Sequence, residues 1–184
     1  MRSPDLPPEE DQALLRKVAA GDRHAFAVLV RRHQRSLYRF ILRQVGRPAV
    51  AEELLQEALL RAYRGAATYE ARAAVSTWLF RIAANLCFNE LQAARSRREV
   101  VGQVPECEFA PNAADKLEQK ETSAAVETAL ASLPPQQRAA VQLARFEGMP
   151  YSDIAEVLGV SVGAVDGLLQ RARLTLRERL RHLT

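Results

Sequence analysis

YSDIAEVLGVSVGAVDGLLQRAR, residues 151–173 of the chain, has the layout of two helices joined by a tight turn. Gly159 can take a positive φ at the turn, and Ser161 is positioned to cap the second helix. The first helix carries an apolar side of Ile154, Ala155 and Leu158. The second carries one stripe of Val165, Leu168, Leu169, Ala172 and Leu176. This layout predicts a helix-turn-helix whose opposite face meets the major groove of DNA. An ordinary helical hairpin has the same stripe, so both interpretations stay open at this point.

The start of the second helix is not basic. Its exposed early positions are Gly163, Asp166, Gly167 and Gln170. Asp166 suits the positive end of the helix dipole but would repel a nearby phosphate. Positive charge comes only later, at Arg171, Arg173 and Arg177. We therefore expect weak DNA affinity for this part alone, with its arginines contacting phosphates.

Outward from this motif, almost every segment has the spacing of an amphipathic helix, and no stretch alternates as a strand does. Helices are predicted at 11–20, 22–45, 50–64, 75–96, 122–133, 136–147, 152–158 and 162–180. Between 97 and 121 the helical spacing of apolar residues is lost, and the stretch is acidic and interrupted by glycine and proline. This composition predicts a flexible linker. The predicted fold class is all-α: a helical domain at 1–96 and a helix-turn-helix domain at 122–184, joined by the linker 97–121.

Charge, cysteine content and the lack of long apolar runs favour a cytoplasmic protein over a secreted or membrane protein. The chain has 184 residues, a formal net charge of +4 and a sequence pI of about 9.4, a mild bias toward polyanions. Cys87 and Cys107 lack metal-ligand spacing, so we expect two reduced thiols. Residues 1–10 are unlike a signal peptide, and no apolar run approaches the roughly 20 residues that span a bilayer. We expect a cytoplasmic protein without membrane insertion.

The helix over 50–64 has two unlike faces. The face expected in the core carries Leu55, Leu59 and Ala62. The other carries Glu53, Gln56, Glu57 and Leu60. A leucine within an acidic patch hints at a protein partner of basic character, whereas Glu and Gln alone would suit a solvated face. From the spacing, the two interpretations are balanced.

The helix over 75–96 and the loop before it combine aromatic, amide and basic side chains. We expect Trp78 to pack in the core with Ile82 and Leu86. Polar groups line an adjoining side, at Thr77, Arg81, Asn85 and Asn89, and the preceding loop contributes Tyr69 and Arg72. Tyrosine is a ring on which a base can stack, so this rim suits single-stranded DNA. A solvated helix would look similar.

Four stretches in this order resemble the sigma-70 family. They are AGDRHAFAVLVRRHQRSLYRF (20–40), AEELLQEALLRAYR (51–64), STWLFRIAANLCFNEL (76–91), and the run from LASLPPQQ at 130 to RERL at 180. Specifically, the chain is similar to the small two-domain group called extracytoplasmic function (ECF) sigma factors. The resemblance extends from about 14 to 180, apart from the linker, which is too short for the further domains of full-size sigma factors.

The resemblance implies a protein that binds core RNA polymerase and directs initiation at promoters. The residues that match the family's docking site for the β′ clamp helices are Glu53, Gln56, Glu57 and Leu60. Those that match the part that opens the −10 element and captures an extruded base are Tyr69, Arg72, Thr77, Trp78, Arg81 and Asn85. Those that match the part that reads the −35 element, beside the β flap, are Ser161, Gly163, Asp166, Gln170, Arg171, Arg173 and Arg177. The resemblance also implies an anti-sigma factor, and a linker threaded toward the RNA exit path. It implies no cofactor, metal, catalytic residue or small-molecule substrate.

This chain departs from the family pattern at three places. The family often has a basic residue where this chain has Ala84, and a frequent arginine is replaced by Ser76. A Lys-Ser-Arg-like run is replaced by Asp166, Gly167 and Leu168. These departures put the −35 contacts and the promoter sequence in doubt, but not polymerase docking.

Two other functions compete. A transcription regulator that binds DNA by itself would need a dimerisation or ligand-sensing element, and the first domain offers neither a heptad seam nor an evident pocket. A helical metal hydrolase would use Glu52, Glu53 or Glu57 with a histidine. However, His24, His33 and His182 have no ligand spacing with those carboxylates, and no catalytic motif occurs.

Overall fold

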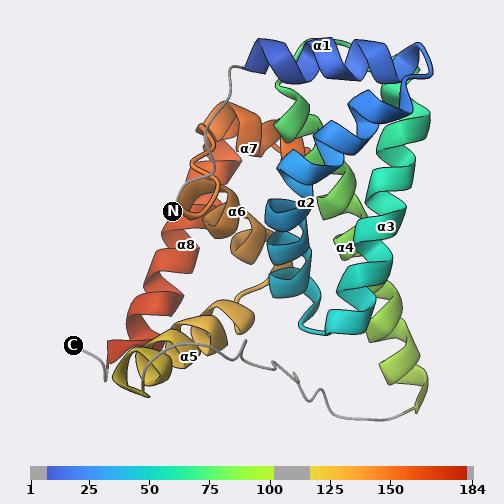
Figure 1. Ribbon diagram of the computed structural model, residues 1–184. Helices are drawn as coiled ribbons and strands as arrows, with labels where there is room; N and C mark the ends of the chain where they lie inside the picture. Colours follow the sequence, from blue (N-terminus) through green and yellow to red (C-terminus); the bar gives the residue numbers. More distant parts are fainter. Residues whose placement is uncertain (1–7, 102–116, 182–184) are drawn as a thin grey trace.

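The computed structural model describes residues 8–101 and 117–181, with side chains over 10–97 and 124–181. The elements are α1 (Pro8–Ala19), α2 (Arg23–Val45), α3 (Pro48–Gly65), the 3₁₀ turn η1 (Ala66–Thr68), α4 (Val75–Val101), α5 (Leu117–Ala131), α6 (Pro135–Arg145), α7 (Tyr151–Leu158) and α8 (Val162–Arg179). No strand occurs within these ranges, which confirms the all-α class. In Figure 1, α1 lies across one end of α2 and α3, while α6 lies between α8 and α2.

Short-range chemistry sets the ends of the helices. The Asp22 carboxylate accepts hydrogen bonds from the backbone N–H groups of His24 and Ala25, at 2.8 and 3.0 Å, and so caps α2. Ser161 caps α8 through Ala164 N at 3.2 Å, as the sequence predicts. Gly159 ends α7 at φ 65°, in the left-handed region, where glycine carries no Cβ penalty.

The predicted linker at 97–121 is shorter than expected. Helix α4 continues to Val101, and α5 already begins at Leu117. The segment 97–101 contains neither glycine nor proline, and 117–121 consists of Leu, Glu, Gln and Lys, which are strong helix formers, so both extend their helices. Residues 102–116, the remainder of the predicted linker, lie outside the described part of the chain.

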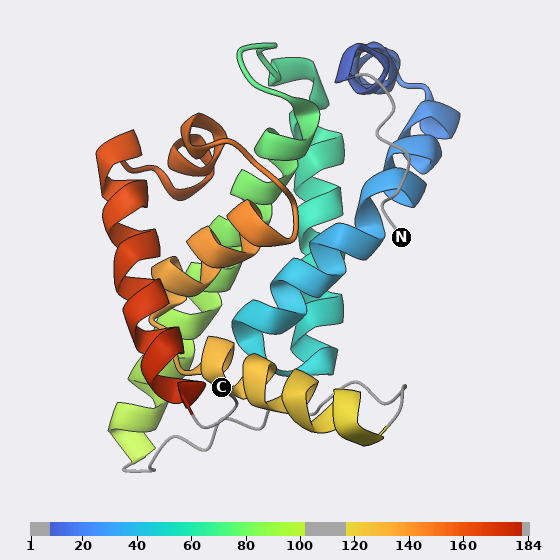
Figure 2. The ribbon, with the colours of Figure 1, turned by 90° about the vertical axis from the view of Figure 1, so that its left-hand side faces the viewer.

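Buried hydrophobic residues from both halves of the chain form one continuous cluster. In the N-terminal half (α1–α4), Phe40 and Phe80 meet edge to face, with ring centroids 5.4 Å apart. In the C-terminal half (α5–α8), Leu143, Ile154 and Val165 are fully buried. Figure 2 shows the C-terminal half lying alongside α2 and α4, so the two predicted domains pack against each other.

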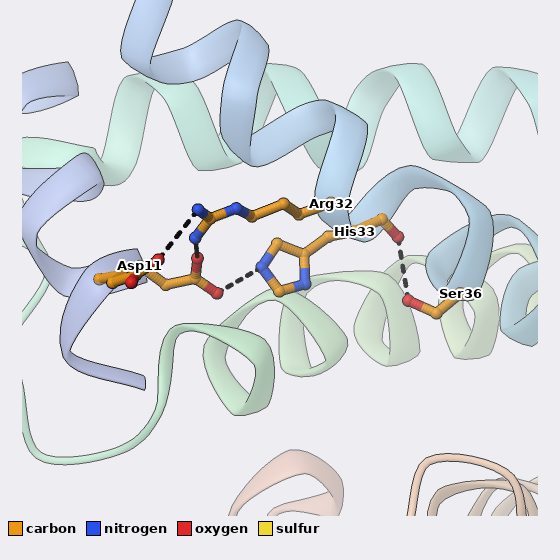
Figure 3. A network of polar contacts seen from close by, with 5 residues as sticks. Asp11, Arg32, His33 and Ser36 are labelled. Carbon is orange, nitrogen blue, oxygen red and sulfur yellow. Dashed lines mark hydrogen bonds and ion pairs between the residues drawn. The ribbon is translucent and has the colours of Figure 1, made fainter. Parts of the chain in front are cut away.

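Helix α1 docks on α2 through a polar network as well as through apolar contacts. Asp11 accepts a hydrogen bond from Arg32 at 2.7 Å and contacts Nε2 of His33 at 2.7 Å, while Arg32 also reaches Glu10 at 3.1 Å (Figure 3). Beneath the network, Leu15 and Val18 of α1 are almost fully buried. Burial alone raises the pKa of the Asp11 carboxyl, but the hydrogen bonds from His33 and Arg32 together outweigh it, so this pKa lies below its usual range.

We expect Asp11→Asn to lower the free energy of unfolding by about 1 kcal/mol at pH 7. The neutral amide lacks the negative charge that strengthens the hydrogen bonds from Arg32 and His33. A carboxyl with a depressed pKa stabilises the fold above its unfolded pKa of about 3.9, and this contribution is lost as the pH falls through the folded pKa. Urea denaturation at pH 7 and in acid should therefore show a gap between wild type and variant that closes below about pH 4. A gap that persists undiminished in acid would contradict this. Glu52→Gln, which removes an exposed acid outside this network, is the control.

Candidate functional site

The acidic face of α3, defined as Glu53, Gln56, Glu57 and Leu60, lies at the surface. Leu60 is 41% exposed, whereas the opposite side of the helix is buried through Ala51, Ala58 and Ala62. Glu57 accepts a hydrogen bond from Arg61 at 2.7 Å, so its charge is partly engaged within the helix. Glu53 and Gln56 are exposed, and together with Leu60 they form a surface that combines acidic, polar and apolar groups.

Tyr69 and Trp78 form an aromatic pair next to the end of α3. Their ring centroids are 5.2 Å apart, and the Tyr69 hydroxyl donates a hydrogen bond to the carbonyl of Ala73. A Cβ atom at Gly65 would lie 3.2 Å from the Trp78 ring, so glycine there permits this close packing. Burial raises the pKa of the Tyr69 hydroxyl, which keeps it protonated as a donor. Both rings are half-buried, and Trp78 packs against the core as predicted.

The predicted −10 surface, defined as Tyr69, Arg72, Thr77, Trp78, Arg81 and Asn85, is exposed only in part. Arg81 and Asn85 lie one turn apart on the open side of α4, and Arg72 is exposed in the preceding loop, where it pairs with Glu70 at 2.7 Å. Ala84 is fully buried in the core, so the departure from the family at this position removes no charge from the exposed surface.

Thr77 does not lie on the exposed rim where the sequence predicts it. Its side chain is fully buried, and its hydroxyl donates a hydrogen bond to the Asp153 carboxylate of α7 at 3.1 Å. Helical spacing placed Thr77 in line with Arg81 and Asn85, but α7 packs on this end of α4. No local pattern reveals a contact between residues so far apart in the chain, and for that reason the sequence interpretation missed Asp153.

The helix-turn-helix has the predicted geometry. Four of the five residues of the α8 stripe, Val165, Leu168, Leu169 and Ala172, are buried, and Leu176 is half-buried against the core. Ile154, Ala155 and Leu158 of α7 are buried as well. The outer face of α8 carries Ser161, Gly163, Asp166, Gln170, Arg171, Arg173 and Arg177, all exposed. Gln170 donates a hydrogen bond to Asp166 at 2.7 Å, so these two residues engage each other. The basic end of the face surrounds Leu174, which is 63% exposed.

Other candidate chemistry is sparse in the described part of the chain. Burial raises the pKa of the Cys87 thiol to about 12, so it stays protonated, while Cys107 lies outside the described residues. Among the residues searched, no group of three or more His, Cys, Asp and Glu side chains is arranged to hold a metal ion. None of the helices described is both long and apolar enough to cross a membrane.

Comparison with solved structures supports the fold. The sigma factor RpoE from Bartonella quintana, solved in complex with the anti-sigma factor NepR, superposes with a TM-score of 0.72. The two chains are 25% identical, and the match covers 85% of this chain and 96% of that one. CnrH, solved with the cytosolic domain of CnrY, has the same fold, with a TM-score of 0.72 and 24% identity over 95% of this chain and 99% of that one.

Sequence comparison gives the family. Residues 29–97 match Sigma-70 region 2, and residues 123–176 match Sigma-70 region 4. The chain is 40% identical to the ECF RNA polymerase sigma factor SigM of Mycobacterium tuberculosis, over 94% of this chain and 86% of the relative. It is 34% identical to the RNA polymerase sigma-H factor of Pseudomonas aeruginosa, over 97% of both chains. This chain therefore belongs to the ECF group of the sigma-70 family of RNA polymerase sigma factors.

Proposed function

We propose that this protein binds core RNA polymerase, directs it to promoters by recognising −35 and −10 elements, and helps to melt the −10 DNA. The observation that carries the proposal is the combination of three surfaces on one small chain. These are the acidic face of α3, the aromatic pair beside α4, and a capped helix-turn-helix in the other half. A regulator that binds duplex DNA by itself would have no use for the first two.

The acidic face of α3 is the proposed docking site for the β′ clamp helices. The carboxylate of Glu53 and the exposed Leu60 offer charge and apolar area together. Complementary charge speeds the encounter and selects the partner, whereas burial of the leucine supplies affinity. A site in which charge sets the rate and the choice of partner, and apolar burial sets the affinity, suits a subunit that binds polymerase reversibly.

The −10 surface is proposed to trap single-stranded DNA. An unstacked base packs against the Tyr69–Trp78 pair, while Arg81 and Asn85 reach the backbone and the base edge. Stacking contributes about 1–3 kcal/mol per base, which is comparable to the few kcal/mol that unpairing costs. Strand opening by this route uses binding energy alone, so the protein requires neither ATP nor a catalytic residue.

The outer face of α8 is the proposed −35 reader. Arg171, Arg173 and Arg177 contact phosphates and position the helix, while the start of the helix offers few base contacts because Asp166 engages Gln170. Affinity of this half for duplex DNA is therefore weak without polymerase. The same half is proposed to touch the β flap.

Membership of the family supports proposals about regulation and location. The relative from Bartonella quintana was solved with an anti-sigma factor, and we infer that an anti-sigma factor also restrains this chain. We propose that the protein acts in the cytoplasm without cofactor, metal, enzymatic activity or membrane insertion, and that the linker passes through the polymerase toward the RNA exit path.

Gel filtration of the protein with purified core RNA polymerase tests the docking step. We expect a stoichiometric complex that survives dilution to submicromolar concentration, and no retention of duplex DNA by the protein alone under the same conditions. Stable binding to duplex promoter DNA without polymerase, and no complex with the core enzyme, would favour the stand-alone regulator instead.

A further inference from the structure

The first ten residues of α8, 162–171, contain a single basic side chain, that of Arg171. Asp166 lies nearer the start of the helix, where its charge would repel a DNA phosphate. Gln170 donates its amide to the Asp166 carboxylate at 2.7 Å, but the amide is neutral and leaves that negative charge in place. The attraction of this part of α8 for DNA therefore depends on where the guanidinium of Arg171 lies.

The guanidinium of Arg171 lies back over Gly167, one turn nearer the start of α8. A Cβ atom at Gly167 would lie 3.4 Å from Nη1 of Arg171, 3.8 Å from Nη2 and 3.9 Å from Cζ. Long side chains of a helix lean toward its N-terminus and cover the preceding turn, so this direction is the expected one. At Gly163, by contrast, a Cβ atom would meet no described residue within 4 Å. The guanidinium thus lies where a side chain at 167 would extend.

This placement moves positive charge toward the start of the helix. Four residues of α-helix rise about 6 Å, so the guanidinium is carried forward by about that distance from the backbone of Arg171. It reaches the level of 166–168, where the sequence has an aspartate, a glycine and a leucine in place of a run with basic residues. Positive charge at this level offsets the repulsion between Asp166 and DNA.

The guanidinium of Arg171 is also free to contact DNA. Arg171 is exposed, and its side chain forms no hydrogen bond or ion pair with any of the described residues. At about 100° per residue, Gly167 lies nearly opposite the buried stripe of α8, so a group above it faces away from the core. All the donors of this guanidinium therefore remain available to oxygen acceptors outside the protein.

We propose that Gly167 is a positioning residue for the contact between α8 and −35 DNA: because it has no side chain, the Arg171 guanidinium can reach a DNA phosphate near the start of the helix, where it offsets the charge of Asp166. This inference rests on the proposed −35 role of α8. The chain thereby supplies from one turn later the positive charge that is missing at 166–168.

Filling the space above Gly167 is the first test. Gly167→Leu places carbon atoms where the guanidinium lies and forces Arg171 away. Fluorescence anisotropy measures binding of the full-length protein to a labelled duplex of random sequence at low salt, because a phosphate contact carries no sequence information. We expect Arg171→Ala to weaken binding about tenfold, and Gly167→Leu nearly as much. Gly167→Ala adds only a Cβ atom at ordinary contact distance, so its loss should be much the smallest of the three.

Two further readouts separate a lost phosphate contact from a damaged helix. The logarithm of the association constant falls linearly with the logarithm of the salt concentration, and loss of one contact should make this slope shallower by about 0.9. Leucine is a better helix former than glycine, so Gly167→Leu should raise the midpoint of thermal unfolding by about 2 °C. Weaker binding by a more stable protein cannot result from unfolding.

A pair of double variants tests whether Gly167 acts through Arg171. In the Arg171→Ala background, Gly167→Leu should cause no further loss, because the group that it displaces is absent. In the Arg177→Ala background, it should cause the same loss as in wild type, since 167 and 177 are about 15 Å apart along the helix and should act independently. An equal loss in both backgrounds would mean that the leucine itself obstructs DNA, and it would overturn the proposal.

The outcomes distinguish this inference from the proposed function. The titrations use free protein and random DNA, so they decide the role of Gly167 whether or not the protein binds core RNA polymerase. Wild-type affinity in either Gly167→Leu or Arg171→Ala would overturn the inference. If these variants bind DNA as wild type does while the protein still directs transcription, the inference alone is wrong. If wild type forms no complex with the core enzyme, the proposed function is wrong, and the double variants still decide whether Gly167 positions Arg171.

Discussion

Replacing Glu53 and Gln56 together with lysine is expected to weaken binding to core RNA polymerase by about 100-fold or more, because placing like charges across an interface costs several kcal/mol. The substitution leaves Glu57 paired with Arg61 and touches none of the buried alanines of α3, so the helix should remain folded. Titration of labelled protein with core enzyme measures the loss, and circular dichroism checks the fold.

The matched control is Gln136→Lys combined with Glu178→Lys. It adds the same positive charge at exposed positions of the C-terminal half. If both double variants lose affinity equally, the loss reflects net charge and not the acidic face of α3. Unchanged affinity in the Glu53 and Gln56 variant would remove this face from the docking site.

Replacing Arg81 and Asn85 together with alanine is expected to slow formation of the open promoter complex by about 100-fold. Each side chain supplies a hydrogen bond to the separated strand, and two such bonds, one of them from a charged group, account for this factor. Core binding should be unchanged, since neither residue lies on the acidic face of α3. Permanganate footprinting of unpaired thymines measures the opening directly.

Gln34→Ala combined with Arg35→Ala removes the same two kinds of side chain from an exposed part of α2 and is the control for that experiment. The control should open promoters normally. Normal opening by the Arg81 and Asn85 variant would mean that the exposed rim of α4 does not hold the strand, and the −10 contacts would then have to come from the aromatic pair.

Features set by neighbouring residues could be predicted from the sequence. The caps at Asp22 and Ser161 and the left-handed Gly159 all depend on residues within a turn of each other, and they occur as expected. The stripe of α8 follows from a spacing that any helix repeats, and it is buried from Val165 to Ala172.

Features set by contacts between the halves could not be predicted. Asp153 resembles an ordinary acid at the start of a helix, and its sequence neighbours do not indicate that it accepts a hydrogen bond from Thr77. Arg138 lies in a plain amphipathic helix, yet it bonds to carbonyls at the ends of two others. Backbone carbonyls carry no sequence signal, so a contact of this kind emerges only once the helices are packed.

The docked arrangement changes how the −10 surface is understood. The helical pattern predicts one continuous polar rim from Thr77 to Asn85, whereas the structure divides it into a covered start and an exposed remainder.

Run-off transcription tests the central claim most directly. Purified core RNA polymerase is incubated with a pool of promoter fragments from the source genome, with and without this protein. The account predicts specific transcripts that appear only when the protein is present and that disappear with the Glu53 and Gln56 double variant. Transcription that is unchanged by the protein, although the same preparation binds duplex promoter fragments by itself, would contradict it.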